Sequence, residues 1–389
     1  MIARLLLSLL AASSCFAQRA ATDSPDGQRR RIRDLGIKVG RGVPGRYNAI
    51  TDVAGVLVGQ VTLSRGDGKL VVGQGPVRTG VTAILPHGGD LWREKVPAAT
   101  WVLNGAGEMT GSIWVNTLGA LEVPILLTNT MNVGRVMDGV VRYMLKKYPE
   151  IGVTDDVVTP VVAECDDSLL NDARGLHVSP EDAIRAIETA KSGPVEEGAV
   201  GAGTGMITYE FKAGIGTSSR VVSKEDGGWT VGALVNSNMG YSRENFTVAG
   251  VPVGREIPEM RVKAREGSII VVLATDAPLD HLALQRLAAR AAMGIARTGA
   301  VSTNGSGDLF IAFSTGNRVP HDSRMRSYRL EVLPRDRLNP LFEAAEEATE
   351  EAVLNALAMA RTTVGRDGNT AYALPLERLV ETMKKYGRL

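Results

Sequence analysis

An unbroken apolar run at residues 269–274 constrains the fold of this chain more than any other feature. A strand with one face in water alternates apolar and polar residues, and this run does not. It therefore predicts a strand buried on both faces, inside a layered structure. A second apolar run, residues 309–313, follows a polar cluster, Asn304-Gly305-Ser306-Gly307-Asp308.

Helical patterns follow both runs. Residues 280–297 place apolar side chains on one helical face, and Gly299 suits the end of that helix. Asn339 and Pro340 predict the start of a long helix, with Asn339 as its cap. The order strand, helix, strand, helix predicts a sheet covered by helices. The β-rich region 33–130 predicts a second sheet packed on the first.

Other segments extend this α/β pattern. Residues 133–147 and 375–386 have helical patterns, and Ser179 marks the start of another helix. The glycine-rich segment 201–205 does not predict a dinucleotide site, because the residues after it alternate like a strand and do not open a helix. No linker divides residues 33–389, which we expect to form a single catalytic domain.

Composition excludes several classes of function. The chain has 389 residues, of which 44% are hydrophobic and 22% charged, so a large core is expected and disorder is not. The net charge is +1 and aromatic residues make up 5%, which gives nucleic-acid binding no support. The four histidines have no metal-ligand spacing and no H-E-x-x-H motif occurs, so we expect no metal and no cofactor.

The N-terminus has the pattern of a secretory signal. Arg4 precedes a short apolar stretch, and Cys15-Phe16-Ala17 fits a small-x-small cleavage site, which predicts a signal peptide at residues 1–17 and a periplasmic or secreted protein. A lipoprotein acylated at Cys15 is the alternative. Residues 18–32 are interpreted as a flexible lead-in whose basic run, Arg29 to Arg31, is solvated. No later segment is long and apolar enough to span a membrane.

Gly267 and Ser268, at the head of the first apolar run, carry the main chemical hypothesis. No G-x-S-x-G elbow occurs, so a serine nucleophile needs another base. Cleavage of the Gly267–Ser268 bond would give Ser268 a free α-amine able to act as that base. By themselves these two residues also fit an ordinary junction between a loop and a strand. The cleaved chain would comprise fragments 18–267 and 268–389.

Seven segments, taken in their order along the chain, favour self-cleavage at Gly267–Ser268 over an ordinary junction. They are residues 48–59, 77–86, 103–111, 201–206 and 235–240, followed by the clusters at Ser268 and Ser306. In this order the chain closely resembles the DmpA family of N-terminal-nucleophile aminopeptidases, peptidase family S58, which includes L-aminopeptidase/D-esterases and β-peptidyl aminopeptidases. The resemblance runs from about Arg33 to about Ala373 and implies an αββα four-layer sandwich.

The resemblance also implies roles for individual residues. Ser268 is the expected nucleophile, Ser306 and Asp308 would hydrogen-bond it and its amine, and Asn236 would donate to the oxyanion. Relatives carry Glu where this chain has Asp308. Without the resemblance, Ser306 and Asp308 fit a turn, and Asn236 fits a polar turn after a strand.

The expected substrate site contains a further carboxylate. Glu164 would hold the α-ammonium of the substrate, or would be an ordinary surface carboxylate. Where some relatives carry an aromatic residue near the oxyanion, this chain has Asp166. Asn129, Asn132 and Asn104 are expected to line the pocket.

The interpretation is a secreted, autoprocessed serine aminopeptidase acting on small peptides, amides or esters. We expect a homo-oligomer of processed alpha–beta units. One alternative is an acyltransferase of the ornithine acetyltransferase type, which Ser268 and the leader disfavour because those enzymes usually have a threonine nucleophile and no export signal. The other is a secreted binding protein on the same scaffold that never cleaves.

Overall fold

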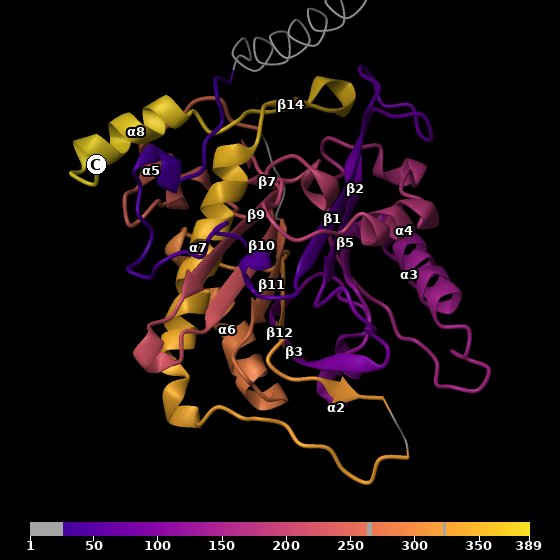
Figure 1. Cartoon of the computed structure of the whole chain (residues 1–389). Coiled ribbons are helices and arrows are strands. Elements are labelled where there is room, and N and C mark those ends of the chain that lie inside the picture. The colour runs from indigo at the N-terminus through magenta and orange to yellow at the C-terminus, as the bar shows by residue number, and fades with distance from the viewer. Residues whose placement is uncertain (1–25, 263–266, 322–323) are drawn as a thin grey trace, which may run out of the picture.

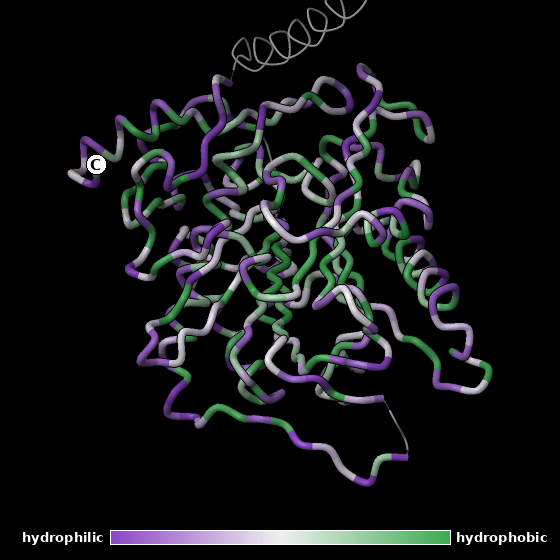
Figure 2. The backbone as a smooth tube through the Cα atoms, viewed as in Figure 1, coloured by the Kyte–Doolittle hydropathy of each residue, from purple (hydrophilic) through white to green (hydrophobic). Residues whose placement is uncertain are grey.

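The computed structural model describes residues 26–262, 267–321 and 324–389. The predicted signal peptide and residues 18–25 of the lead-in lie outside the described residues. Two β-sheets pack face to face in the middle of the molecule, and helices cover the outer face of each (Figure 1). Figure 2 shows hydrophobic segments gathered along the strands in the middle. The predicted αββα sandwich is therefore confirmed.

Within the described residues, one sheet has four strands in the order β1–β2–β5–β6. Only β5 and β6 are parallel neighbours. The strands and the two helices that cover them are β1 (Leu57–Arg65), β2 (Val77–Leu85), β5 (Ile125–Asn129), β6 (Val161–Cys165), α3 (Val133–Lys147) and α4 (Pro180–Glu188).

The other sheet has seven strands within the described residues, in the order β13–β3–β12–β11–β10–β9, with β4 paired to β3. The helices α6 (His281–Arg297) and α7 (Asn339–Met359) pack on its outer face. Its strands are β3 (Glu94–Gly105), β4 (Ala120–Leu121), β9 (Ile215–Val221), β10 (Thr230–Asn238), β11 (Ser268–Thr275), β12 (Gly307–Ser314) and β13 (Val319–Pro320).

The two predicted apolar strands are β11 and β12, which pair in parallel at the centre of the seven-stranded sheet. Every residue of both strands is buried. Ile269 and Val271 pack toward α6 and α7, whereas Ile270 and Val272 belong to the core between the sheets. Because side chains alternate along a strand, Ser268 points toward the second sheet.

Short elements complete the fold at its edges. They are α2 (Ser112–Leu118), α5 (Val253–Glu256), α8 (Leu376–Lys385) and two small hairpins, β7 (Ile207–Thr208) with β8 (Phe211–Lys212) and β14 (Thr363–Val364) with β15 (Thr370–Ala371). No helix among the described residues is long and apolar enough to cross a membrane.

The predicted helices occur close to their expected limits. Ser179 and Asp182 form the capping box of α4, and Asp280 caps α6 through the amide of Ala283. Asn339 was predicted as the cap of α7, and this is wrong: it is the first helical residue, and Leu338 precedes it without a side-chain cap.

Residues 206–211 were expected to form a strand but instead fold into the β7–β8 hairpin. Tyr209 and Glu210 have φ values of 50° and 60°, which reverse the chain between the two strands. Gly201–Gly203 forms a short 3-10 helix, and the next element is the strand β7.

The basic run was predicted to be solvated, and this is wrong for two of its three arginines. Arg29 is buried and donates to the carbonyls of Leu357 and Leu374. Arg31 forms an ion pair with Glu197 at 2.7 Å. Buried carbonyls and a buried carboxylate need donors, so this segment is a packed part of the domain.

Candidate active site

Ser268 is the first residue of β11 and lies between two paired strands. Asn238 of β10 is its antiparallel partner, and Asp308 of β12 pairs with the next residue, Ile269. The serine is buried, with 7% of its surface exposed. The backbone amide of Gly307 donates to its Oγ at 3.2 Å. The sheet thus fixes the position of this hydroxyl from both sides.

Gly267 approaches the neighbouring strand too closely for any side chain. A Cβ atom at this position would lie 1.7 Å from the carbonyl oxygen of Asn238, well inside a contact distance. Asn238 is itself held, because its side-chain oxygen accepts from the amide of Ile207 and its side-chain nitrogen donates to the carbonyl of Asp166. The Gly267–Ser268 bond therefore lies against a rigid carbonyl that only glycine allows.

Asp308 is the centre of a small hydrogen-bond cluster beside Ser268. Ser306 Oγ donates to its Oδ1 at 2.7 Å, and Ser302 Oγ donates to its Oδ2. Burial raises the pKa of the Asp308 carboxyl, and the two hydroxyl donors act in the opposite direction. The predicted pair Ser306 and Asp308 is therefore brought together near Ser268, and Ser302 is a third member that the sequence did not indicate.

Asn104 holds the loop that carries this cluster. Its side-chain nitrogen donates to the backbone carbonyls of Thr303, Asn304 and Ser306. It was predicted to line the pocket, and it does not. The pairing of β3 with β12 shifts register directly after Asp308, and such bulges are frequent beside active sites.

Asn236 lies on the same face of β10 as Asn238, two residues away, and pairs with Ile270. Its side chain is fully buried, and neither its nitrogen nor its oxygen has a hydrogen-bond partner among the described residues. A buried amide without partners costs about 1–3 kcal/mol. The side chain therefore carries an unpartnered donor on the Ser268 side of the sheet, although it does not line the cavity described below.

Glu164 reaches the site from the other sheet, near the end of β6. It is 4% exposed, and its two oxygens accept from the backbone amide of Glu108 at 3.0 Å and from the hydroxyl of Thr130. Burial raises the pKa of the Glu164 carboxyl, with the nearby charges of Asp166 and Glu108 acting in the same direction. The alternative of an ordinary surface carboxylate is wrong, because the side chain is buried.

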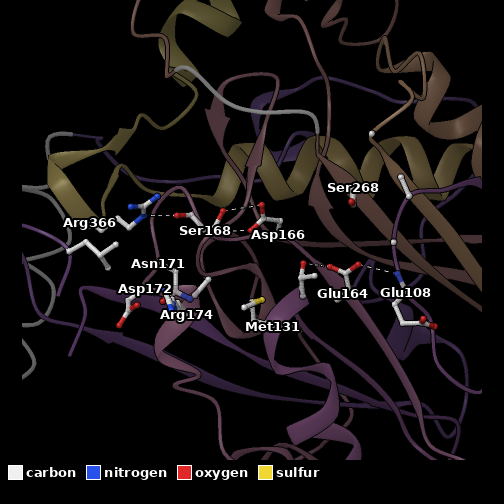
Figure 3. A pocket seen from close by; sticks show the side chains of 16 residues that line it. Glu108, Met131, Glu164, Asp166, Ser168, Asn171, Asp172, Arg174, Ser268 and Arg366 are labelled. Atoms are coloured by element: carbon white, nitrogen blue, oxygen red, sulfur yellow. Dashed lines mark hydrogen bonds between the residues drawn. The ribbon is translucent and has the colours of Figure 1, made fainter. Parts of the chain in front are cut away.

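Ser268 and Glu164 open into the same cavity, which has a volume of about 660 Å³. Such a volume is typical of small-molecule sites, which measure roughly 300–1,000 Å³. Figure 3 shows Ser268, Glu164 and Glu108 at one end of the cavity and Arg174 and Arg366 at the other. The remaining lining residues are Leu70, Ala106, Gly107, Thr130, Met131, Asp166, Ser168, Asn171, Asp172, Ala173 and Gly305.

Comparison with known proteins identifies the family. The model of peptidase family S58 matches residues 48–371. The chain belongs to peptidase family S58. It is 47% identical to the curated β-peptidyl aminopeptidase BapA of Sphingosinicella microcystinivorans, covering 97% of this chain and 96% of that protein.

Two solved structures confirm the fold of this S58 peptidase. The L-aminopeptidase D-Ala-esterase/amidase of Ochrobactrum anthropi, described as a variant of the Ntn hydrolase fold, matches with a TM-score of 0.86 and 44% identity over 92% of this chain and 99% of that chain. The PH0078 protein of Pyrococcus horikoshii matches with a TM-score of 0.89 and 51% identity over 92% and 100%. The chain is thus a hydrolase of the aminopeptidase type.

Two asparagines of this S58 peptidase that were predicted to bind substrate do not line the cavity. Asn129 donates to Thr79 and Asp167, and it accepts from the amide and side chain of Asn132. Both are buried at the end of β5, where they shape the turn into α3. The Asn129 side-chain oxygen accepts both bonds from Asn132 and so holds the turn, and this reason for being polar is not visible in sequence.

Sequence reasoning missed several residues of the S58 site. Thr130 and Glu108 hold Glu164, and Arg174 and Arg366 form the far end of the cavity. Thr130 follows directly after the predicted Asn129, which is the one signal that pointed near it. The others lie in separate loops, and nothing in one sequence links them.

The structure also gathers side chains that could ligate a metal ion. Ligand atoms of Asp155, Asp156 and His321 lie within 4.8 Å of one another. Motif spacing in the sequence did not indicate this group, because His321 is far from Asp155 and Asp156 along the chain. The oxygens of Asp155 already accept from Trp92 and bond to His321, and none of the three lines the Ser268 cavity. The group therefore does not take part in the S58 site.

Proposed function

We propose that this chain is a secreted serine aminopeptidase that cleaves its own Gly267–Ser268 bond and then removes N-terminal residues from small peptides, amides and esters. The observation that carries the proposal is the position of Ser268. Ser268 lines the same cavity as the buried Glu164, and its Oγ accepts from the Gly307 amide. The residue before it, Gly267, lies so close to the carbonyl of Asn238 that no side chain would fit there.

In the self-cleavage step, Ser268 Oγ attacks the Gly267 carbonyl carbon. The bond from that carbon to the Ser268 nitrogen breaks, and the nitrogen takes up a proton to replace the one lost by the hydroxyl. The product is an ester between Gly267 and Oγ, which water hydrolyses to a Gly267 carboxylate and a free serine hydroxyl. The new α-amine, with an ordinary pKa of about 7.7–8.0, is then the base for turnover.

In turnover the freed hydroxyl attacks the substrate carbonyl and forms an acyl-enzyme, which water releases. Asn236 supports this step because its side-chain nitrogen is a buried donor without a partner on the Ser268 face. Asp308, with Ser302 and Ser306, lies beside the serine and would orient the hydroxyl and the amine. Glu164 would pair with the substrate ammonium, which limits cleavage to the first residue.

The curated relatives suggest which first residues to test. Two proteins named β-peptidyl aminopeptidase are 47% and 42% identical to this chain over 97% and 94% of its length. We therefore propose that N-terminal β-residues are among the substrates. Arylamides of L-alanine, D-alanine and β-homoalanine, compared by kcat/KM, would rank the three classes directly.

The sequence motivates the proposed location and assembly. The leader at residues 1–17 supports export, with cleavage after Ala17. Expression with the native leader, fractionation and N-terminal sequencing would test this, and a mature chain that starts at Met1 in the cytoplasm would contradict it. A homo-oligomer of processed units is expected, and light scattering of the purified protein would measure its mass.

The decisive experiment is mass spectrometry of purified wild type and Ser268→Ala. Wild type should yield a fragment that begins Ser-Ile-Ile-Val-Val, and the alanine variant should stay intact and inactive. Ser268→Cys retains a nucleophile and serves as the matched variant, with some processing expected. An intact, active wild-type chain would overturn the mechanism, and an intact inactive one would favour a binding protein.

Thiol and metal reagents test the rest of the proposal. Cys165 is fully buried and burial raises the pKa of its thiol well above the ordinary value, so iodoacetamide should leave activity unchanged. EDTA should also leave activity unchanged. Loss of activity with EDTA that zinc restores would identify a metal dependence that the proposal does not contain.

A further inference from the structure

The cavity beside Ser268 is electrically polarised along its length. Glu164 and Glu108 lie with Ser268 at one end, and Arg174 and Arg366 lie at the other, on the far side of Met131 and Asp166 (Figure 3). A peptide has the opposite arrangement, with an ammonium at its first residue and a carboxylate at its last. Complementary charge of this kind fixes the orientation of a ligand.

Arg174 is free to bind a ligand. It lies in the short 3-10 helix Ala173–Gly175, its side chain is exposed to the cavity, and it forms no hydrogen bond or ion pair with the described residues. An arginine presents several N–H donors in a planar fork that matches both oxygens of a carboxylate. An unpaired arginine in a cavity wall can therefore donate hydrogen bonds to a carboxylate of the ligand.

Arg366 is fixed in place by the protein but keeps a free edge. Its Nε donates to the carbonyl of Ser168 at 2.7 Å, and its Nη1 pairs with Asp367 at 3.1 Å. Its Nη2 makes no hydrogen bond with the described residues. The guanidinium is thus held in a set orientation, with one donor left over at the same end of the cavity as Arg174.

Asp172, the acid that lines this end of the cavity, pairs with neither arginine, and Arg366 has its one ion pair among the described residues with Asp367. Both oxygens of Asp172 are already used: Oδ1 accepts from the amide of Gly175, and Oδ2 accepts from the amide of Gly73 and bonds His177 Nε2 at 2.8 Å. Its side chain is almost completely buried. Asp172 therefore shapes the loop that carries Arg174 and does not form an ion pair with it.

We propose that Arg174, assisted by Arg366, forms a subsite for a substrate carboxylate, so that the enzyme favours short peptides with a negative charge at the end remote from Glu164. This inference rests on the proposed function, because it takes Glu164 as the site of the ammonium. The C-terminal carboxylate of a dipeptide or tripeptide is one source of that charge. An acidic side chain on the first residue is the other.

The test compares kcat/KM for three substrates. Two are a dipeptide H-Xaa-Ala-OH and its amide H-Xaa-Ala-NH₂, where Xaa is the first residue that wild type cleaves fastest. The third is H-Glu-Ala-NH₂, which moves the carboxylate to the first side chain. The variants are Arg174→Gln and Arg174→Lys. The matched control is Arg255→Gln, which changes an exposed arginine of α5 whose side chain forms no hydrogen bond or ion pair with the described residues.

Wild type should cleave at least one of the two carboxylate substrates, H-Xaa-Ala-OH or H-Glu-Ala-NH₂, faster than the amide H-Xaa-Ala-NH₂. Arg174→Gln should lower kcat/KM for the preferred carboxylate substrate by roughly 10- to 100-fold, as expected for loss of a charged hydrogen bond. The amide should change much less, Arg174→Lys should fall between, and Arg255→Gln should match wild type. The substrate that responds identifies the source of the carboxylate. The preference should also decrease at high salt.

Two outcomes overturn the subsite. One is equal loss on acid and amide substrates, and the other is no loss on either carboxylate substrate. Either result would leave the proposed function standing as long as Ser268→Ala remains unprocessed and inactive on the amide. If Ser268→Ala is active, the proposed function fails whatever Arg174 does, so the two failures are distinguishable.

Discussion

Two buried carboxylates flank Ser268, and they differ in how they are built. Asp308 is 1% exposed and Glu164 is 4% exposed, and burial raises the pKa of both carboxyls. Asp308 accepts from two hydroxyls six and two residues before it in the chain. Glu164 accepts from groups 56 and 34 residues away. The partners of Asp308 thus lie close to it in sequence, whereas the partners of Glu164 are brought to it by the fold.

The two carboxylates also face different spaces. Glu164 lines the large cavity that would hold the substrate, whereas Asp308 lines a small separate cavity with Ser302, Ser306 and Tyr241. In the proposed mechanism, this arrangement would separate a group that touches the substrate from one that acts on the nucleophile. Changes at Asp308 should therefore affect every reaction of Ser268, and changes at Glu164 should affect only substrates with an ammonium.

The largest effect is expected for Asp308→Asn. The amide removes the charge that accepts from Ser302 and Ser306, so self-cleavage and turnover should both slow by roughly 10²-fold or more. Gel analysis of processing and kcat on a free-amine anilide and an N-acetyl ester would measure this. Asp308→Glu keeps the charge and should retain much of the activity. An Asp308→Asn enzyme that processes normally would remove Asp308 from the mechanism.

Glu164→Gln should give a smaller and more selective loss. Without the negative charge, KM for a free-amine anilide should rise roughly 10- to 100-fold, while the N-acetyl ester and self-cleavage change little. Glu225→Gln changes an exposed side chain that forms no hydrogen bond or ion pair with the described residues, so it should match wild type and serves as the control. Equal weakening of both substrates would assign Glu164 a structural role.

The pH dependence should separate the two substrates in the same way. Glu164 binds an ammonium only when ionised, so that affinity is present above its pKa and lost as pH falls through it. Because burial raises this pKa, the loss should begin at a higher pH than for an ordinary glutamate. The ratio of kcat/KM for the anilide to that for the N-acetyl ester, measured below pH 7, should fall with pH in wild type and stay flat in Glu164→Gln.

The smallest effect is expected for Ser302→Ala. This change removes one of the two hydroxyls on Asp308 and leaves Ser306 in place, so turnover of both substrates should slow by about three- to tenfold. Ser223→Ala removes a similar bond to Asp226 outside the cavity and should leave the kinetics unchanged. An effect confined to the free-amine substrate would show that the two carboxylate clusters are not independent.

The same contrast explains what the sequence could predict. The strands at Ser268 and Asp308 contain the unbroken apolar runs 269–274 and 309–313 and follow one another along the chain. Their burial and their polar leading residues could therefore be read directly. Glu164 was found through the family resemblance, but its partners Thr130 and Glu108 were not, because only the packing of three segments far apart in the chain brings them together. Arg174 was missed for the same reason.

The sequence predictions failed where contacts between segments far apart in the chain decide the role of a polar side chain. The run at Arg29 and Arg31 looks solvated in sequence. Arg29 nevertheless donates to carbonyls in the C-terminal part of the chain, and Arg31 donates to the carbonyl of Thr217 and pairs with Glu197. Asn129 and Asn132 were expected at the substrate, but the turn after β5 uses their side chains. The role of a polar residue next to a site cannot be read from sequence, because stabilising a turn and binding a substrate both use the same hydrogen-bonding side chains.

The central position of β11 has a consequence for the proposed cleaved enzyme. β11 would begin the second fragment, yet it pairs with β10 of the first from Ser268 to Thr275, and β12 pairs with β3. At the opposite end, the amide of Ile32 donates to Asn355 of α7. The two fragments would share one sheet and could not part without unfolding. Denaturation would then release two molecules from one, so the midpoint and the recovery of activity would depend on protein concentration. The intact Ser268→Ala chain keeps both parts of the sheet in one molecule, so its refolding should depend less on concentration than that of the cleaved enzyme.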